Sequence, residues 1–262
     1  MLPAFSPRRH AGFHPAVAVV HRVPLAGLTS TVRVAHLTDL HFGTVTPTAL
    51  LDDAVATTNA LRPDLVVLTG DFVARGRRFL DAMRGTLQGL EAPAFGVLGN
   101  HDHWVGAAAV RAHLDRAGVA VLDNARCPAA LPGGLQLLGV DDGTTGRAAP
   151  AAATAGLPPG APVLALSHNP EVAPVLWAGG AGLVLAGHTH GGQLHVGEWT
   201  RPLWKKMLRI RFLAGWYAGP GGARLYVNPG VGSSVLPWRV GAPCQRTVAL
   251  LELHPPEVPG PG

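Results

Sequence analysis

Histidine and acidic side chains occur in this sequence in five short clusters that follow apolar stretches. The clusters are Asp39-Leu40-His41, Gly70-Asp71, Gly99-Asn100-His101-Asp102, Ser167-His168-Asn169-Pro170 and Gly187-His188-Thr189-His190. Imidazole nitrogens combined with carboxylate oxygens suit Zn, Mn or Fe better than Ca or Mg. The clusters therefore predict a transition-metal site whose ligands come from separate parts of the chain.

Each cluster taken alone has an ordinary structural explanation. Asp71 and Asn100 each follow a glycine, as turn residues do, and His168 could cap a turn before Pro170. Five such clusters in one chain, all behind apolar stretches and flanked by Gly or Pro, are not expected by chance. The combination favours a metal site with these candidate ligands: Asp39, His41, Asp71, Asn100, His168, His188 and His190.

Two clusters carry their candidate ligands two residues apart. On extended backbone, Asp39 and His41 would point to the same side, and so would His188 and His190. The two side chains of each pair would then reach the same place in the structure. Of the other histidines, His103 stays open because it adjoins the Asn100 cluster. We assign the remaining ones to the surface or to packing: His10, His14, His21, His36, His113, His195 and His254.

The apolar stretches predict the elements that must position these clusters. Strands are predicted at residues 16–20, 32–37, 65–68, 94–98, 119–122, 135–140, 163–166, 183–185, 225–227 and 248–253. Helical spacing predicts helices at residues 49–61, 79–90 and 110–117. This alternation indicates an α/β (α+β) fold. In open α/β sheets, ligands bind beyond the carboxyl ends of strands, which is where the clusters lie.

The length and amino-acid composition limit the kinds of fold that the chain can adopt. The 262 residues, 47% hydrophobic and 14% charged, exclude a disordered chain and suffice for one domain with a buried core. We expect a single domain over residues 1–262, with a core at about 16–254. A flexible N-terminal arm, a flexible tail from Pro255 and an Ala/Gly/Pro-rich loop at residues 143–160 complete the prediction.

Charge, cysteines and hydropathy bear on the environment of the protein. The net charge of +5 favours anionic substrates or surfaces. Cys127 and Cys244 lack metal-ligand neighbours, and we expect two unrelated thiols, with one disulfide as the alternative. No apolar run reaches transmembrane length, and residues 15–20 are too short for a signal-peptide core. We therefore expect a cytoplasmic protein.

The ordered clusters resemble those of the calcineurin-like metallophosphoesterase superfamily. The motifs are Thr38-Asp39-Leu40-His41, Thr69-Gly70-Asp71, Gly99-Asn100-His101-Asp102, Ser167-His168-Asn169-Pro170 and Gly187-His188-Thr189-His190. Two further stretches are similar to the YkuE/YaeI-like bacterial phosphodiesterase subgroup, namely Gly191-Gly192-Gln193 and residues 226–232. The resemblance implies a two-sheet β-sandwich flanked by helices, with the metals at the strand ends.

The resemblance also implies roles for the clustered residues. One metal ion would be held by Asp39, His41 and His190, and the other by Asn100, His168 and His188. Asp71 would bridge the two ions. His101 would protonate the leaving group, and Asp102 would orient His101. The cofactors expected are two divalent transition-metal ions, Mn, Fe or Zn.

This set predicts a metal-dependent phosphohydrolase. A hydroxide bridging two ions would attack phosphorus in a phosphodiester or pyrophosphate bond, with a lipid-linked or nucleotide-sugar compound among the candidate substrates. One alternative is a non-catalytic metal-binding scaffold that recruits proteins, although such a protein usually lacks part of the ligand set. Another is a nuclease, which is disfavoured because the sequence has no aromatic-interleaved basic groove and no known nucleic-acid module.

One further segment, from Arg201 to Leu213, interleaves basic and apolar residues. It predicts either an ordinary helix or strand packed on the domain, or a lid that contacts lipid at a membrane surface. We expect Lys205, Lys206 and Arg209 to contribute to binding an anionic lipid substrate in the second case. The sequence leaves both interpretations open, as it does the oligomeric state.

Overall fold

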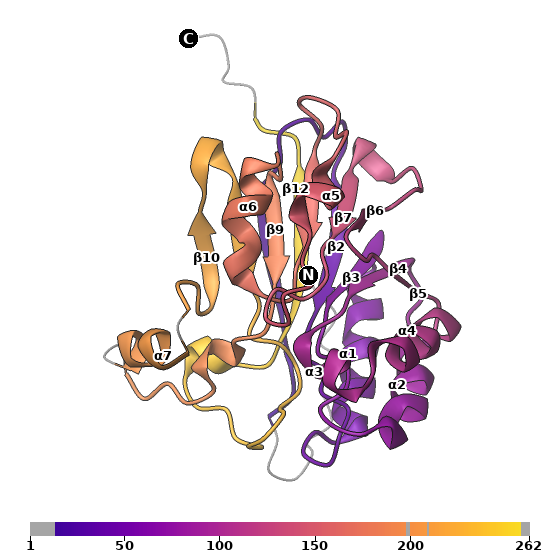
Figure 1. Cartoon of the computed structure of the whole chain (residues 1–262), viewed down its shortest axis with the longest axis vertical. Helices are drawn as coiled ribbons and strands as arrows, with labels where there is room; N and C mark the ends of the chain where they lie inside the picture. The colour runs from indigo at the N-terminus through magenta and orange to yellow at the C-terminus, as the bar shows by residue number, and fades with distance from the viewer. Residues whose placement is uncertain (1–13, 198–199, 209, 258–262) are drawn as a thin grey trace.

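Two six-stranded sheets packed face to face form the centre of the molecule (Figure 1). The computed structural model describes residues 14–197, 200–208 and 210–257. The strand order in the first sheet is β1-β12-β2-β3-β4-β5, and in the second it is β10-β11-β9-β8-β7-β6. Both sheets are mixed, with parallel strands at their centres. The predicted two-sheet α/β sandwich is therefore confirmed.

The strands of each sheet come from separate parts of the chain. The first sheet contains β1 (Val17–Pro24), β2 (Val32–Leu37), β3 (Leu65–Thr69), β4 (Ala94–Val97), β5 (Val119–Val121) and β12 (Thr247–His254). The second contains β6 (Ala125–Arg126), β7 (Gln136–Gly139), β8 (Val163–Leu166), β9 (Leu183–Ala186), β10 (Gly215–Ala218) and β11 (Arg224–Val227). The first sheet is thus built mainly from the first half of the chain, and β12 joins it from the far end.

Helices cover the outer faces of the sandwich (Figure 1). The helices of the described residues are α1 (Thr48–Ala60), α2 (Leu80–Leu87), α3 (Asn100–Val105), α4 (Ala107–Arg116), α5 (Pro150–Thr154), α6 (Ala173–Ala178) and α7 (Thr200–Leu208). One buried cluster joins α1, α2 and α4 to the first sheet, and another joins α5 and α6 to the second. A third lies between the sheets. Strands with both faces covered must be apolar throughout, as in β3, where all five residues are buried.

Every strand and helix predicted from apolar spacing is present, with ends shifted by a few residues. The prediction of a continuous loop at residues 143–160 was wrong, because Pro150 begins the short helix α5. Proline is well tolerated at the start of a helix, and the buried Ala153 packs α5 against the second sheet. Short elements such as β6, β10 and α6 were not predicted because they are too short to show a period.

The structure also bears on the predictions about thiols, helices and membrane spans. Cys127 and Cys244 are both free, as expected. Residues 201–208 form most of the helix α7, whereas Arg209 lies outside the described residues. Among the described residues, no helix is both long and apolar enough to cross a membrane.

Candidate metal centre

The candidate ligands lie at the carboxyl ends of five strands that belong to both sheets. Asp39, Asp71 and Asn100 follow the neighbouring strands β2, β3 and β4 of the first sheet. His168 and His188 follow the neighbouring strands β8 and β9 of the second sheet. Because the two sheets are stacked, these strand ends meet at one edge of the sandwich. The structure therefore brings together residues that are as far apart as 39 and 190 in the chain.

Most of the candidate ligands have an unusual backbone conformation. Five have positive φ angles: Asp39 (51°), His41 (49°), Asp71 (53°), His188 (74°) and His190 (51°). The predicted extended backbone at both Asp-x-His and His-x-His was therefore wrong. A non-glycine residue in this region costs on the order of 1–3 kcal/mol and persists only where surrounding contacts fix it. Such conformations cluster at functional sites, and none of them was visible in the sequence.

Hydrogen bonds between segments hold these turns in place. The Asp39 N–H donates to the Gly70 carbonyl at 3.0 Å, and the His41 N–H donates to the Asp71 carbonyl at 3.0 Å. The His188 N–H donates to Asp39 Oδ2 at 3.0 Å. The Gly232 N–H donates to the Asp39 carbonyl at 2.7 Å, so the segment at residues 226–232 braces the first turn. The chain thereby fixes the side chains before any ion binds.

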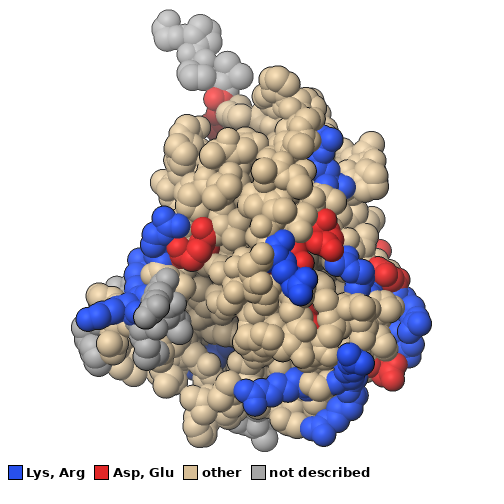
Figure 2. Space-filling view, viewed as in Figure 1, with Lys and Arg blue, Asp and Glu red and all other residues tan. Residues whose placement is uncertain are grey.

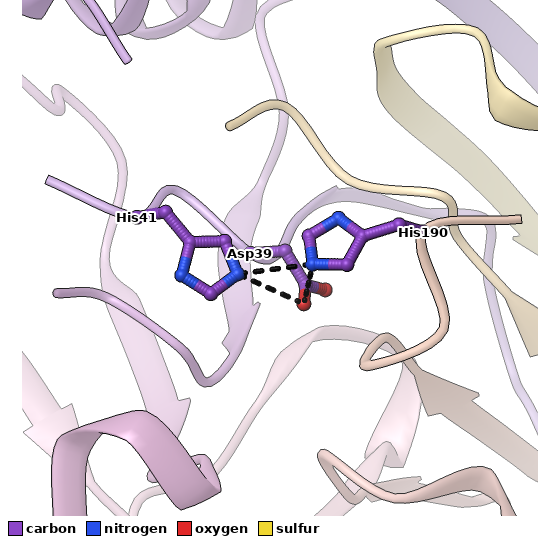
Figure 3. Close-up of side chains that lie close together, drawn as sticks. All are labelled: Asp39, His41 and His190. Carbon is purple, nitrogen blue, oxygen red and sulfur yellow. Dashed lines mark hydrogen bonds and ion pairs between the residues drawn. The ribbon is translucent and has the colours of Figure 1, made fainter. Parts of the chain in front are cut away.

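Asp39, His41 and His190 form the first candidate group (Figure 3). Nε2 of His41 lies 3.0 Å from Nε2 of His190, and Asp39 Oδ1 lies 3.7 and 3.5 Å from these two nitrogens. Asp39 Oδ1 is buried and has no hydrogen-bond partner among the described residues. Three electron-pair donors that converge in this way, one of them an orphaned carboxylate oxygen, fit a metal ion.

Asp71, His168 and His188 form the second group. His168 Nε2 lies 3.4 Å from Asp71 Oδ2, 3.1 Å from Nδ1 of His188 and 3.2 Å from Oδ1 of Asn100. Asp71 Oδ2 also lies 3.5 Å from Nε2 of His41, a member of the first group. One carboxylate oxygen thus stands between the two groups, where a bridging ligand would be needed.

The pKa values in this centre are shifted by burial and by the charges of neighbouring carboxylates and imidazoles. Burial alone would raise the pKa of Asp71, but the nearby His168 and His41 imidazoles hold it below its ordinary value. Burial would lower the pKa of His168, yet the Asp71 carboxylate raises it to about 10. In the absence of metal a proton on His168 therefore balances Asp71. A bound cation would take over that task and release the proton.

The buried donor set therefore fits transition-metal ions. His168 donates from Nδ1 to the Thr69 carbonyl at 2.7 Å, which leaves Nε2 facing Asp71. Such a contact fixes the ring and its tautomer, as it does for metal-binding histidines in general. Burial, with a further contribution from Arg239, keeps the pKa of His190 well below its ordinary value. The neutral imidazole is the form that binds metals.

His101 lies at the edge of the same centre. Its Nε2 is 4.0 Å from Asp71 Oδ2, its Nδ1 donates to the Ala74 carbonyl at 2.7 Å, and its ring is partly exposed. The ring also stands close to His41 and Asp71 as a third possible metal-binding group. A partly exposed imidazole next to two candidate metal positions is placed to exchange a proton with a substrate.

The structure revises how Asp102 can act on His101. Asp102 is buried, and its carboxylate accepts the Gly99 N–H at 2.9 Å and the Val73 N–H at 3.2 Å. The His101 ring is held instead by the carbonyl of Ala74, the residue after Val73. Any orientation of His101 by Asp102 thus passes through the backbone. Burial and the Asp71 charge raise the pKa of Asp102 to about 8 in the metal-free chain.

Two residues at the centre were not found from the sequence. Arg239 places Nη2 at 2.6 Å from Nδ1 of His190 and donates to several backbone carbonyls, including those of Pro229 and Gly230. Since a guanidinium only donates, Nδ1 of His190 is the acceptor in this contact. Trp104, 67% exposed, packs its ring 4.6 Å from that of His101. No local motif marks either residue.

The other histidines lie mostly outside the centre. His103, left open by the sequence, places Nε2 at 2.7 Å from Oδ1 of Asp141, so it is paired rather than directed at the metal groups. His36 is buried and hydrogen-bonded to Thr69 at 2.8 Å. Burial lowers its pKa to about 3, which makes it a neutral packing residue as predicted. His195 is buried too.

The glycines before the ligands serve two different purposes. Gly70 has φ +85°, a conformation that favours glycine. Gly99 has φ −106°, but a Cβ atom there would overlap the carboxylate and main-chain nitrogen of Asp71. The sequence predicted sharp turns at both positions. At Gly99 the actual requirement is the close approach of Asp71, which leaves no room for a Cβ atom.

Replacing Gly99 with Ala is therefore expected to displace Asp71 and to lower both metal content and turnover. Misplacement of a reacting group by about 1 Å can cost roughly 10²-fold in rate. Elemental analysis and a phosphoesterase assay would measure both effects. Gly85→Ala is the control, because Gly85 lies in α2 with open space around it and alanine favours helices. Full metal content in Gly99→Ala would contradict the structural argument.

Comparison with known proteins shows the family to which the chain belongs. Residues 32–192 match the calcineurin-like phosphoesterase family. The chain is 34% identical over 231 residues to phosphodiesterase YaeI of Escherichia coli (strain K12), which covers 84% of this chain and 82% of that protein. It is 29% identical to the uncharacterized metallophosphoesterase YkuE of Bacillus subtilis (strain 168), with coverage of 84% and 79%.

Among solved structures, the NAD nucleotidase of Haemophilus influenzae aligns with a TM-score of 0.48 and 13% identity, covering 78% of this chain and 45% of that one. The match to the family spans the two groups of candidate ligands from Asp39 to His190. The chain therefore belongs to the calcineurin-like phosphoesterase family.

Proposed function

We propose that the protein is a binuclear metallophosphoesterase that hydrolyses a phosphodiester or pyrophosphate bond. The observation that carries this proposal is the position of Asp71 Oδ2, 3.5 Å from Nε2 of His41 and 3.4 Å from Nε2 of His168. One carboxylate oxygen thus serves both candidate groups. Two bound ions would supply a deprotonated water as nucleophile and would neutralise the phosphoryl oxygens.

The chain's own residues have separate roles in this proposal. One ion would be held by Asp39, His41 and His190, and the other by Asn100, His168 and His188, with Asp71 as a ligand to both. The His101 ring, held through Nδ1 by the Ala74 carbonyl, directs Nε2 towards Asp71 and gives its proton to the leaving oxygen. Asp102 fixes the backbone around this ring. The whole site lies in a single domain formed by both sheets.

A preference for diesters is supported by the relative YaeI, which is named a phosphodiesterase. An amphiphilic substrate is supported by the position of Trp204 and Ile210, which line a cavity that His188 and His190 also line. We extend the proposal to a lipid-linked or nucleotide-sugar substrate reached from the surface of a membrane. Nucleic acid remains the disfavoured substrate.

Elemental analysis and chelation test the metal requirement. We expect two ions of Mn, Fe or Zn per chain, loss of activity with EDTA and recovery after reconstitution. Bis(4-nitrophenyl) phosphate should be hydrolysed with a higher kcat/KM than 4-nitrophenyl phosphate. A fully active enzyme with one ion or none would refute the binuclear proposal, and a preference for the monoester would refute the diester assignment. Inhibition by single-stranded DNA would favour a nuclease.

A further inference from the structure

A cavity of about 250 Å³ lies beside the candidate metal centre. Its wall is formed by the turn after β9, by α7 together with Ile210, and by residues 235–240, which we call the 235–240 loop. The lining residues are His188, Thr189, His190, Gly192, Gln193, Leu194, Trp204, Ile210 and Leu236. Because two candidate metal ligands contribute to its wall, a molecule in the cavity would reach the centre directly.

Hydrogen bonds hold the 235–240 loop against the turn after β9. The Gln193 side chain donates from Nε2 to the Leu236 carbonyl at 2.7 Å and to the Trp238 carbonyl at 3.3 Å. The Val240 N–H donates to the Gln193 carbonyl at 3.0 Å, and the His195 N–H returns a bond to the Val240 carbonyl at 2.7 Å. This wall is therefore preformed, as the walls of ligand sites usually are.

Trp204 is fixed just as closely. Its indole Nε1 donates to the Leu194 carbonyl at 2.6 Å, so the polar end of the ring is satisfied and its apolar face is available. The ring approaches Gly192 so closely that a Cβ atom there would lie 2.9 Å from Trp204 Cδ1. Gly192 also has φ +83°. Gly192, the second residue after His190, therefore admits an aromatic ring next to the metal centre.

The lining chemistry favours hydrocarbon over charged groups. Leu194, Trp204, Ile210 and Leu236 supply apolar side chains, and no Asp, Glu, Lys or Arg occurs among the described lining residues. A dry apolar cavity of about 150 Å³ is already large enough to bind benzene. The charged phosphoryl group of a substrate would stay at the metals, while an apolar substituent would enter the cavity.

Two cations of this segment, Arg211 and Lys205, have contacts with side chains that do not line the cavity. Arg211 donates from its N–H and from Nε to the carboxylate of Glu171 at 2.6 and 2.7 Å. Lys205 lies with Nζ 5.7 Å from the centre of the Tyr217 ring. Figure 2 shows blue and red side chains close together on the side of the molecule where α7 lies in Figure 1. The predicted role of Lys205, Lys206 and Arg209 in headgroup binding stays a prediction, because Arg209 lies outside the described residues.

We propose that this cavity binds a hydrocarbon chain of the phosphoester substrate, an inference that rests on the function proposed above. The chain packs against the apolar side chains of Trp204, Ile210 and Leu236. Each methylene group of the hydrocarbon chain that is buried raises the affinity for the substrate. The cavity therefore selects esters that carry an alkyl or acyl substituent. A substrate whose substituents are all polar would gain nothing from it.

Calorimetric titration with a series of alkylphosphonates, from methyl to hexyl, tests the cavity. Burial of one methylene group is worth roughly a fourfold gain in affinity, so affinity should rise steadily with chain length. Leu236→Gln and Ile210→Gln, which change lining residues from two different segments, should each flatten this rise while leaving methylphosphonate binding unchanged. Val235→Gln is the matched control, because Val235 is 63% exposed, adjoins Leu236 and does not line the cavity.

The same series as alkyl 4-nitrophenyl phosphodiesters links binding to turnover. We expect kcat/KM to rise with chain length in the native enzyme and in Val235→Gln but not in the two cavity variants. Equal affinity for methyl- and hexylphosphonate would overturn the proposal, and so would a rise that survives in both cavity variants. If the protein binds longer phosphonates more tightly but hydrolyses none of the esters, the proposed function is refuted. The proposed binding of hydrocarbon in the cavity is then still supported.

Discussion

Asp71→Asn is expected to abolish turnover and to remove at least one metal ion per chain. Two unit charges about 4 Å apart repel by about 4 kcal/mol at an effective dielectric constant near 20, and two divalent ions repel roughly four times as strongly. The carboxylate between the two groups offsets this repulsion. Asparagine has nearly the same shape but carries no charge, so both ions can no longer be held together.

The fold should survive this substitution. Asp71 Oδ1 accepts the His101 N–H at 2.9 Å, and the carbonyl oxygen of asparagine can accept the same bond. Circular dichroism, elemental analysis and turnover of a chromogenic diester would be measured together. Asp115→Asn is the control because Asp115 is exposed on α4. If Asp71→Asn kept two ions and normal turnover, the bridging role would be excluded.

The second large effect is expected for His101→Asn. Loss of a general acid typically costs 10²–10⁴-fold in rate, and we expect a decrease in kcat of about that size. The loss should be smaller for nitrophenyl esters than for alkyl esters, because a good leaving group needs little protonation. Steady-state kinetics with both kinds of ester would measure the difference.

Metal content separates two possible roles of His101. Its Nε2 lies 4.0 Å from Asp71 Oδ2, close enough for the ring to belong to a metal-binding group. If His101 is a proton donor, His101→Asn keeps both ions and loses kcat. Loss of an ion, or an equal rate loss for good and poor leaving groups, would identify it as a ligand instead. His113→Asn, which changes a histidine on α4, serves as the control.

The sequence was informative about this centre because the histidine and acidic side chains directly follow the ends of predicted strands. Apolar stretches such as residues 65–69 are buried on both faces and therefore carry a strong signal. The residue after such a strand must lie at the edge of the sheet, so the sequence alone could assign Asp71 and His168 to one region. Stacking of the two sheets then completes the centre.

Features that depend on long-range contact could not be predicted in the same way. The left-handed backbone of Asp39 and His41 is held by hydrogen bonds to the carbonyls of Gly70 and Asp71 and by one from the Gly232 N–H. Arg239 reaches His190 across 49 residues, and the wall formed by Leu236 depends on a bond from Gln193. Local spacing contains no trace of such partners. For the same reason, the pairing of Arg211 with Glu171 was missed.

The position of β12 in the first sheet has a consequence for synthesis on the ribosome. β12 lies between β1 and β2, so residues 247–254 separate two strands that are made more than two hundred residues earlier. Until those residues leave the exit tunnel, β1 cannot join the sheet and β2 keeps an open edge. Unpaired edges invite aggregation, and contacts of such high sequence separation slow folding. The exposed edge of β2 therefore stays open to aggregation until residues 247–254 have been made.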